Sequence, residues 1–402
     1  MLEAIFYKIS SYIQLVFCGL STLSCASAAQ PPNQLNLNLP SGFEATVFAK
    51  LDSAPRMLAF DKNGNLFVSL SKSNQVIMLP DTNSDGLSEA GILVADKLNA
   101  PNGLAFAGDD LLVANQDSVV KLFKNSDKWS APQPFIDGLA SGGHTLKTIK
   151  ISPDNFLYLN VGSSCNVCVE DDPTRATLLR YTLDGKPAGK LAVLGRHAHL
   201  APVWARGLRN SQGFAWQPAT GALFATNNGS DMRSSTKNGK INDDIPPEHF
   251  NKIEGGKHYG WPHCWGKQAN NNQQITDPNF AGSDNFCANT TPPAITFDSH
   301  STPIGVTFLD KTNFPTEYKN DAIVALHGSW NRQQLSGYKL VRVKFDNNIP
   351  TEVIDFTTGW LNNNQAWGRP VDVITGPDGA LYVSDDRANV IYRIAYKKTH
   401  QH

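Results

Sequence analysis

The sequence predicts an all-β fold, a six-bladed β-propeller built from four-stranded antiparallel blades, and three observations support this prediction. A strand-like phrase that follows a turn signal recurs six times along the 402 residues. Only 18% of the residues are Asp, Glu, Lys or Arg, while 31 are Gly and 24 are Pro, a composition typical of many short strands joined by turns. No helical period of useful length appears after residue 40.

The recurring phrase sets the number of blades. Its copies lie at residues 63–69, 108–114, 153–159, 220–225, 319–325 and 377–384. Between equivalent positions the steps are 45, 46, 66, 99 and 59 residues. The first two match the period of roughly 40 to 50 residues of a propeller blade, so the longer steps indicate insertions in blades three to five. The largest insertion holds residues 231–298.

A second alternating run follows most copies and predicts the hairpin partner inside each blade. These runs lie at residues 74–79, 119–123, 177–181, 338–345 and 390–396. A four-stranded sheet cannot bury both of its faces alone, whereas sheets stacked radially cover one another and leave a central channel for ligands. We therefore expect a single propeller domain over residues 40–397, preceded by residues 30–39 as an exposed tail or a lead into the first strand.

Residues 1–29 have the features of a secretory signal peptide. Lys8 gives a positive start, residues 13–23 form an apolar run too short to span a bilayer, and residues 26–29 offer small side chains for cleavage. We expect an exported protein, periplasmic or secreted, with no transmembrane span. Lipidation of Cys25 after cleavage is an alternative that would anchor the protein to a membrane. The formal net charge of −1 gives no reason to expect nucleic acid or an anionic membrane as a partner.

Four of the six cysteines lie beyond the signal segment, at Cys165, Cys168, Cys264 and Cys287. In an oxidising compartment they most simply form two disulfides, and the pairs Cys165–Cys168 and Cys264–Cys287 close the shortest loops. Other connectivities remain open. Val169 stands where a covalent c-type haem requires His, and the second pair has the wrong spacing for a zinc ribbon or finger.

The stretch best suited to a ligand runs from Gly207 to Pro262. It begins Gly207-Leu208-Arg209-Asn210, where glycine lets the backbone approach a ligand and the guanidinium offers a fixed fork of donors. A strand-like run at 221–226 is followed by the polar segment 227–231, and a long loop after a strand often carries function. The structural alternative is that Arg209 and Asn210 cap a turn and Trp261 packs beneath it.

Several motifs occur in order along the chain. They are Gly142-Gly143-His144, Val161-Gly162-Ser163-Ser164-Cys165-Asn166-Val167-Cys168, Gly207-Leu208-Arg209-Asn210-Ser211-Gln212-Gly213, Asp243-Asp244-Ile245-Pro246-Pro247-Glu248, Gly255-Gly256-Lys257-His258-Tyr259-Gly260-Trp261-Pro262, His327-Gly328-Ser329-Trp330-Asn331-Arg332 and Trp367-Gly368-Arg369-Pro370-Val371-Asp372-Val373. Together they resemble the pyrroloquinoline quinone (PQQ) sugar dehydrogenases, above all the sorbosone dehydrogenase branch. The resemblance covers roughly residues 40–397. It implies an oxidoreductase that acts on an aldose or a sugar aldehyde and passes electrons to an external acceptor.

The resemblance implies that His144 is the catalytic base. Neutral imidazole accepts a proton readily near neutral pH, and the glycines before His144 suit a loop that reaches a substrate hydroxyl. In the glucose dehydrogenase branch an acidic residue precedes this histidine, whereas this sequence has Gly143. The orientation of the imidazole is therefore open. Without the resemblance, a lone histidine at this position would be interpreted as a surface or turn residue.

The resemblance also implies contacts to the quinone. Arg209 and Asn210 match the family residue by residue, Arg369 matches nearly as well, and Arg332 stands in the blade where the glucose branch uses a lysine. Taken singly, each arginine would be interpreted as a surface cation. Because these residues come from blades four, five and six, we expect them to meet at one mouth of the channel.

Calcium is implied in the same way. The family holds it largely through backbone carbonyls after the strand of blade four, which here are those of Gly229 and Ser230, and a hard cation prefers such oxygen ligands. A separate segment, Asp81-Thr82-Asn83-Ser84-Asp85-Gly86, copies the first half of a calcium loop, but Ile92 occupies the position of the bidentate glutamate. We interpret that segment as an acidic turn, with a structural calcium site as the alternative.

These residues predict a reaction. Arg209, Asn210 and Arg369 would hold the quinone, calcium would polarise its carbonyl oxygens, and His144 would take the proton from the anomeric hydroxyl or hydrated aldehyde as hydride passes to the quinone. Two other classes remain open. The phrase Pro101-Asn102-Gly103-Leu104-Ala105-Phe106 also occurs in calcium-dependent lactonases on six-bladed propellers, although carboxylates ringing the channel are not apparent here. The other class is a secreted, non-catalytic propeller that only binds protein partners.

Overall fold

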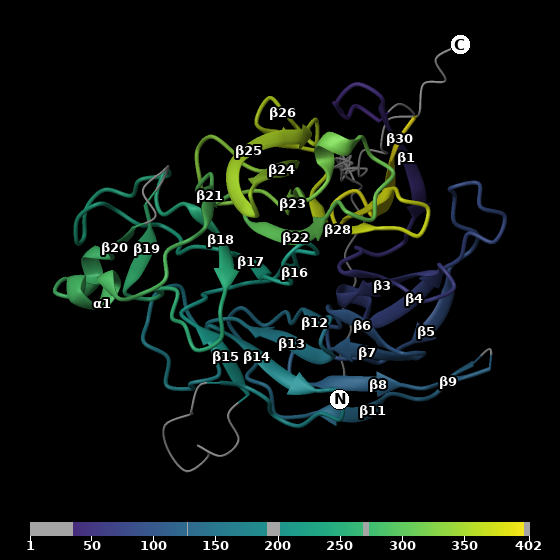
Figure 1. Cartoon of the computed structure of the whole chain (residues 1–402), viewed down its shortest axis with the longest axis horizontal. Helices are drawn as coiled ribbons and strands as arrows, with labels where there is room; N and C mark the ends of the chain where they lie inside the picture. The colour runs from purple at the N-terminus through teal and green to yellow at the C-terminus, as the bar shows by residue number, and fades with distance from the viewer. Residues whose placement is uncertain (1–34, 127, 191–201, 268–272, 398–402) are drawn as a thin grey trace, which may run out of the picture. The chain divides into compact units, whose positions relative to one another are not determined.

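Six four-stranded antiparallel sheets follow one another along the part of the chain that the computed structural model describes, residues 35–126, 128–190, 202–267 and 273–397 (Figure 1). This confirms the prediction of an all-β, six-bladed propeller. Each of the six phrases found in the sequence forms the second strand of its blade, and each of the five alternating runs forms a third strand. The third strand of blade four was not among the predicted runs.

The first three blades are assembled from consecutive strands, with one short hairpin inserted in blade two. Blade one consists of β2 (Leu58–Phe60), β3 (Leu66–Leu70), β4 (Gln75–Leu79) and β5 (Ile92–Ala95). Blade two consists of β6 (Leu104–Ala107), β7 (Asp110–Ala114), β8 (Val119–Leu122) and β11 (Gln133–Ile136), with the hairpin β9 (Lys124–Asn125) and β10 (Lys128–Trp129) between the last two. Blade three consists of β12 (Ile149–Ile151), β13 (Phe156–Val161), β14 (Thr177–Thr182) and β15 (Val203–Arg206).

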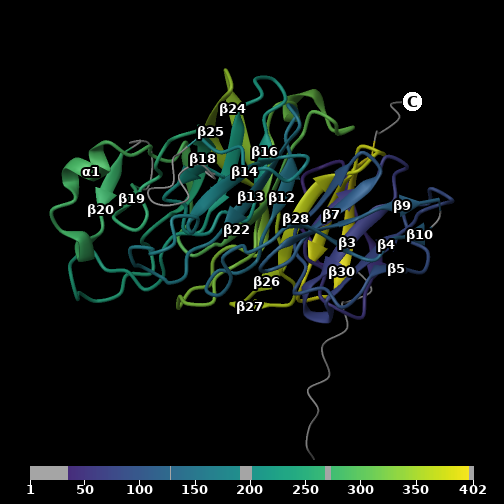
Figure 2. The ribbon, with the colours of Figure 1, turned by 90° about the horizontal axis from the view of Figure 1, so that it is seen from below.

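Blade four carries the largest insertion, as the spacing of the phrases predicted. Blade four consists of β16 (Phe214–Trp216), β17 (Leu223–Asn227), β18 (Glu248–Ile253) and β21 (Ile295–Phe297). Between β18 and β21 lie β19 (Cys264–Gly266), β20 (Gln274–Thr276) and the short helix α1 (Asp284–Ala288), which contacts β20 (Figure 2). Blade five consists of β22 (Pro303–Phe308), β23 (Ala322–Leu326), β24 (Lys339–Asp346) and β25 (Ile349–Thr357).

Blade six joins the two ends of the domain. It consists of β28 (Pro370–Thr375), β29 (Leu381–Asp385), β30 (Val390–Tyr396) and, as its outermost strand, β1 (Phe43–Lys50) from the start of the domain. The hairpin β26 (Leu361–Asn362) and β27 (Gln365–Ala366) precedes this blade. No local pattern indicated that residues 43–50 complete the last blade, because this pairing joins segments far apart in the chain.

The core lies between the blades because successive side chains of a strand point to opposite faces of its sheet. In β3, Leu66 and Val68 pack on blade six beside Tyr382, whereas Phe67 packs on blade two beside Leu111. Alternation of this kind repeats in the second strands of the other blades. Their continuous apolar runs therefore reflect burial on both faces, which explains why the six phrases were visible in the sequence.

The segments before each first strand and after each second strand meet at the same end of a blade, since the two strands form an antiparallel hairpin. Residues 142–144, 207–213, 227–231, 327–332 and 385–386 occupy such positions. The innermost strands of neighbouring blades contact one another, β2 with β6 and β28, and β22 with β16 and β28. The fold therefore gathers these segments at one end of the propeller.

None of the helices in the described part of the chain has the length and apolar character needed to cross a membrane. The expected signal segment, residues 1–29, and Cys25 within it lie outside the described residues.

Buried His258 makes folding stability depend on pH. Its Nδ1 accepts a hydrogen bond from the N–H of Gly260 at 3.0 Å, and burial, aided by the charges of Arg206 and His263, lowers its pKa to about 4. Between pH 6.5 and 4 only the unfolded chain takes up the proton, so this contribution to stability is lost as the pH falls through that range. We expect the unfolding free energy of the wild type to drop about 2 kcal/mol more between pH 7 and pH 4.5 than that of His258→Gln.

Denaturant titrations of the two proteins at both pH values measure this difference. Equal losses in the wild type and His258→Gln would show that His258 does not remain neutral in the folded protein.

Candidate functional site

His144 lies in the loop before β12, and its hydrogen bonds fix which ring nitrogen is free. Its Nδ1 is 2.9 Å from the Oγ of Ser163. Ser163 donates its own hydroxyl proton to the carbonyl of Cys165 at 2.7 Å, so its oxygen accepts the proton on Nδ1. Burial, together with the charge of Arg209, lowers the pKa of His144 to about 4. The imidazole is therefore neutral near pH 7 with its lone pair on Nε2, and Ser163 takes the orienting role for which the sequence showed no acidic residue.

Arg209 is buried, and most of its donors are used inside the protein. Its Nε and Nη2 donate to the backbone oxygen and the Oδ1 of Asn166 at 3.0 and 2.9 Å, its Nη2 also to Asp231 Oδ2 at 2.7 Å, and its Nη1 to the carbonyl of Gly229 at 2.6 Å. A guanidinium has five N–H groups, so one N–H on Nη1 is left for a ligand. Arg209 therefore holds its protein neighbours in place and keeps one N–H for a ligand.

Asn210 adjoins His144 with an unpaired oxygen. Its backbone N–H donates to Asn227 Oδ1 at 3.1 Å, while its own Oδ1 is buried and has no partner among the described residues. A Cβ built on Gly162 would lie 2.4 Å from His144 Cβ and 3.3 Å from Asn210 Oδ1. Only glycine at position 162 lets these two side chains approach each other across the backbone.

Gly229 and Ser230 follow β17, as the sequence indicated, and oxygen atoms surround them. The carbonyl of Gly229 keeps one lone pair beyond its bond to Arg209, Asn228 Oδ1 is buried without a partner in the described structure, and Glu248 Oε2 accepts the N–H of Gly229 at 2.5 Å. Burial raises the pKa of Glu248 to about 8, although the Gly229 N–H and Arg209 oppose this rise. A donor set made only of oxygen suits a hard cation, so these residues fit calcium.

Arg332 is connected to Arg209 indirectly, through Asn331 and Asp231. Its Nη1 donates to the carbonyl of Ser299 at 2.9 Å and its Nη2 to Asp244 at 3.1 Å, but its buried Nε has no partner within the described residues. Asn331 beside it donates to Asp231 Oδ1 at 2.8 Å, and Asp231 also pairs with Arg209. The loop of blade five is therefore joined to the arginine of blade four by Asp231.

Arg369 belongs to a second cluster, centred on Asp386. Arg369 Nε and Arg56 Nη1 pair with this carboxylate at 2.7 and 2.9 Å, and His327 Nε2 lies 3.1 Å from it. Burial alone would raise the pKa of Asp386, but the hydrogen bond from His327 and the charges of the two arginines hold it far below its usual range. Arg56 Nη2 also donates to Gln212 at 3.2 Å, which connects this cluster to the segment that carries Arg209 and Asn210.

The structure thus brings His144, Arg209, Asn210, Gly229 and Ser230 together, joins Arg332 to them through Asp231, and places Arg369 in the adjoining cluster. Four buried polar atoms here lack a partner in the described structure, on Asn210, Asn228, Asn331 and Arg332. Buried polar groups are rarely left unpaired, so the region fits a polar ligand. The Nε of Arg332 can donate to an anionic group such as a quinone carboxylate, whereas the three amide oxygens suit a hydrogen-bond donor or a cation.

Sequence reasoning missed the groups that hold the predicted residues in place. These are Arg56, Ser163, Asn166, Asp231 and Asp386. Asn166 and Asp231 lie within segments already singled out, so their position beside Arg209 was a usable signal. Arg56 and Asp386 carry no comparable motif, because they meet only when blades one and six close the ring.

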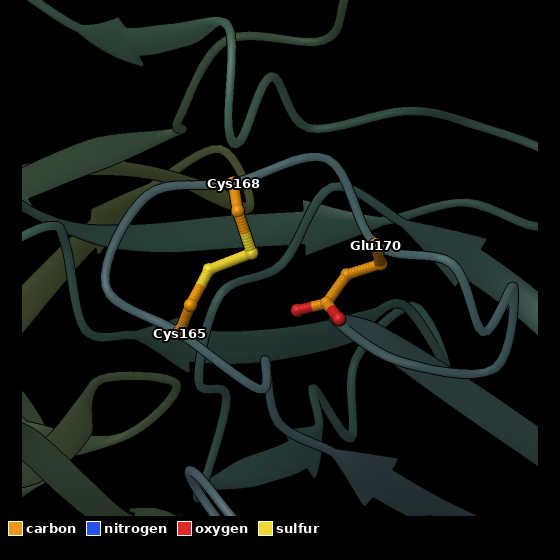
Figure 3. A group of neighbouring side chains, drawn as sticks. All are labelled: Cys165, Cys168 and Glu170. Atoms are coloured by element: carbon orange, nitrogen blue, oxygen red, sulfur yellow. A yellow bond between two sulfur atoms is a disulfide. The ribbon is translucent and has the colours of Figure 1, made fainter.

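Both expected disulfides are present, Cys165–Cys168 and Cys264–Cys287. Figure 3 shows the first of them closing a tight loop, with the side chain of Glu170 on the segment that follows Cys168. Glu170 accepts hydrogen bonds from the backbone N–H and the hydroxyl of Ser164, both at 2.7 Å. With both sulfur atoms in a covalent bond, this group has no thiolate to offer a metal.

The acidic turn at Asp81 lies between β4 and β5, at the opposite end of blade one from the candidate site. Its carboxylates are used within the turn. Asp81 accepts the N–H groups of Asp85 and Gly86, both at 3.1 Å, and Glu89 accepts the hydroxyl of Thr82 at 2.6 Å. These bonds agree with the interpretation as an acidic turn.

The fold and this group of side chains define a β-propeller with a cluster of polar side chains at one end of its blades, where a neutral histidine adjoins arginines and oxygen donors. The model of the TrAA12-like family matches residues 37–397, and the chain belongs to this family.

Several relatives of this chain are PQQ-dependent sugar dehydrogenases. The pyrroloquinoline quinone-dependent pyranose dehydrogenase of Coprinopsis cinerea is 24% identical over 92% of this chain, and the chain spans 56% of the length of that enzyme. The structure of its PQQ domain in the holo form has a TM-score of 0.77, covering 92% of this chain and 99% of that one, at 24% identity. The calcium structure of the family AA12 enzyme of Trichoderma reesei has a TM-score of 0.76 and 19% identity, covering 92% of this chain and 98% of that one.

Proposed function

We propose that this chain is a PQQ-dependent dehydrogenase that oxidises an aldose or a sugar aldehyde, sorbosone and glucose being representative substrates. The observation that carries the proposal is the neutral His144, whose free Nε2 lies in the same site as Arg209 and Asn210. The names of the relatives support the same class of reaction.

The quinone would be held by donors that the protein leaves unused. Arg369 engages only its Nε with Asp386 among the described residues, Arg332 keeps a free Nε, and Arg209 keeps one N–H. These groups suit carboxylates, since guanidinium and carboxylate form short charge-assisted hydrogen bonds. When bound, the quinone supplies the two-electron acceptor that no side chain provides.

Calcium would be held at Gly229 and Ser230, with Asn228 Oδ1 and Glu248 as further oxygen donors beside them. When bound there, the ion supplies a Lewis acid next to the quinone. The protein's own contribution is to keep these oxygens in place, which it does through Arg209 and through the bond from Gly229 N–H to Glu248.

His144 would accept the proton from the anomeric hydroxyl of an aldose or from a hydrated aldehyde through Nε2. Because Ser163 holds the proton on Nδ1, the lone pair needs no tautomer change before it acts. Trp330 in the adjoining loop has 71% of its surface exposed, and such a flat apolar ring is suited to stack on the face of a sugar. Export, with residues 1–29 as the signal, and an external electron acceptor complete the proposal.

The low pKa of His144 predicts an unusual pH dependence. We expect kcat/KM of the quinone-loaded protein to stay level from pH 7 to pH 5 and to fall with a midpoint near pH 4, because only then is the base protonated. Initial rates at low sugar concentration over pH 3.5–8 measure this profile. A midpoint near 6.5, the ordinary value for histidine, would contradict a buried, neutral His144 as the base.

Dye reduction by the purified full chain tests the function. We expect sugar-dependent reduction only after both PQQ and calcium are added, with a panel of aldoses and sugar aldehydes identifying the preferred substrate. A calcium-dependent lactonase would instead hydrolyse lactones without quinone, and a purely binding propeller would show neither activity. Either of these results would overturn the proposal.

A further inference from the structure

One short loop touches both halves of the candidate site. It runs from Ser163 to Cys168 after β13, and the Cys165–Cys168 disulfide closes it (Figure 3). At its start, Ser163 lies against His144, both through its hydroxyl and through its backbone carbonyl, which accepts the backbone N–H of His144 at 2.9 Å. A Cβ on Gly143 would lie 2.5 Å from the carbonyl oxygen of Ser163, so the His144 loop packs directly on this backbone.

Asn166, enclosed between the two cysteines, binds the other half of the site. Its side-chain Oδ1 accepts from Arg209 Nη2 at 2.9 Å and from the N–H of Asp231 at 2.8 Å, and its Nδ2 donates to the carbonyl of Asp231 at 2.9 Å. Its backbone oxygen accepts from Arg209 Nε at 3.0 Å, Trp261 Nε1 at 3.2 Å and Ser230 Oγ at 3.4 Å. One residue of blade three thus fixes an arginine and a segment of blade four.

These bonds need the loop to be held closed. Asn166 is exposed to solvent, so water competes for its donors and acceptors whenever the loop opens. A disulfide restricts the open conformations of the segment it spans, and here that segment is Asn166 with Val167. The carbonyl of Cys165 belongs to the same loop and accepts the Ser163 proton that sets the tautomer of His144.

We propose that the disulfide-closed loop 163–168 positions the site as a unit: Ser163 orients His144, Asn166 holds Arg209 and the segment 229–231, and the Cys165–Cys168 bond keeps both residues in register. Ser163 and Asn166 are positioning residues, since they act through other side chains. The inference rests on the proposed function for its effect on quinone and sugar, but its effect on the segment 229–231 does not depend on any ligand.

Three variants should give three different patterns. Asn166→Ala should weaken PQQ binding about 10- to 100-fold, because it removes bonds to a charged group. Ser163→Ala should lower kcat up to about tenfold with PQQ affinity unchanged, because it removes the Oγ 2.9 Å from His144 Nδ1 and leaves only the backbone carbonyl of residue 163, at 3.2 Å, to orient the ring. Cys165→Ser/Cys168→Ser should show both losses. Cys264→Ser/Cys287→Ser is the control, since it removes the other disulfide and should change neither quantity.

Quenching of tryptophan fluorescence by PQQ in the presence of calcium gives the affinity, and dye reduction at saturating PQQ gives kcat. Hydrogen exchange of the backbone amide of Asp231 in the quinone-free protein is the ligand-independent readout. We expect it to quicken at least tenfold in Asn166→Ala and in the Cys165/Cys168 variant, with thermal melting used to confirm that each variant is folded. Failure of the wild type to bind PQQ would refute the proposed function. The Asp231 exchange would still test the inference, because it is measured without ligand. Unchanged Asp231 exchange in folded Asn166→Ala would overturn the inference.

Discussion

Replacing His144 by alanine should lower turnover by about 10²- to 10⁴-fold while PQQ binding stays close to that of the wild type. The imidazole touches the reacting hydroxyl in the proposed reaction, whereas the candidate contacts to the quinone are on Arg209, Asn210, Arg332 and Arg369. Stopped assays at saturating PQQ, calcium and sugar measure turnover, and fluorescence titration measures binding.

His263→Gln is the control for this experiment, because burial also lowers the pKa of His263 but this histidine lies in the insertion of blade four, beyond the stretch from Gly207 to Pro262. Near-native turnover in His144→Ala would assign the base to another residue. A loss of turnover that is matched by a loss of PQQ affinity would show that His144 serves binding and not proton transfer.

Replacing Asp386 by asparagine should lower the free energy of unfolding by about 3–5 kcal/mol at neutral pH. The substitution keeps the shape of the side chain but leaves Arg56, whose side chain is 10% exposed, and Arg369 without their shared carboxylate. Because the pKa of Asp386 is depressed, its contribution is fully present above about pH 4 and is lost as the pH falls further.

Denaturant titration of the quinone-free protein measures the effect, with Asp355→Asn as the control. Asp355 pairs with Lys339 at 2.5 Å, but its side chain is 54% exposed, so this substitution should cost less than about 1 kcal/mol. Equal small losses in the two variants would mean that blades one and six are not joined through the Asp386 cluster.

Features of the fold that are local in the chain could be predicted from the sequence. The second strands are buried on both faces, so each shows a continuous apolar run after a turn, as at Leu381 and Val383. The two disulfides also follow from proximity, because each pair closes the shortest loop available. By contrast, β1 completes blade six by pairing with β30 across nearly the whole chain, and no local pattern identifies that partner.

The candidate site also has a part that local sequence predicts and a part that only the fold brings together. His144, Arg209 and Asn210 stand in motifs that a resemblance can locate, and the structure places them side by side. The partners that set their protonation and orientation are selected by three-dimensional contact: Ser163 for His144, Asp231 for Arg209, and Asp386 for Arg369. Arg209 donates four hydrogen bonds inside the protein, and nothing in the local sequence shows this. The arginine was therefore predicted chiefly as a ligand contact.

The most direct measurement of the proposed reaction is a single turnover without any external acceptor. The purified full chain, loaded with PQQ and calcium and kept free of oxygen, is mixed with one sugar from the panel while the absorption spectrum of the bound quinone is followed. We expect the spectrum to change completely at one equivalent of sugar, with one equivalent of oxidised sugar recovered, and we expect His144→Ala to reach the same end point about 10²- to 10⁴-fold more slowly. A loaded wild type whose spectrum does not respond to any aldose or sugar aldehyde would contradict the proposal that this site oxidises sugars.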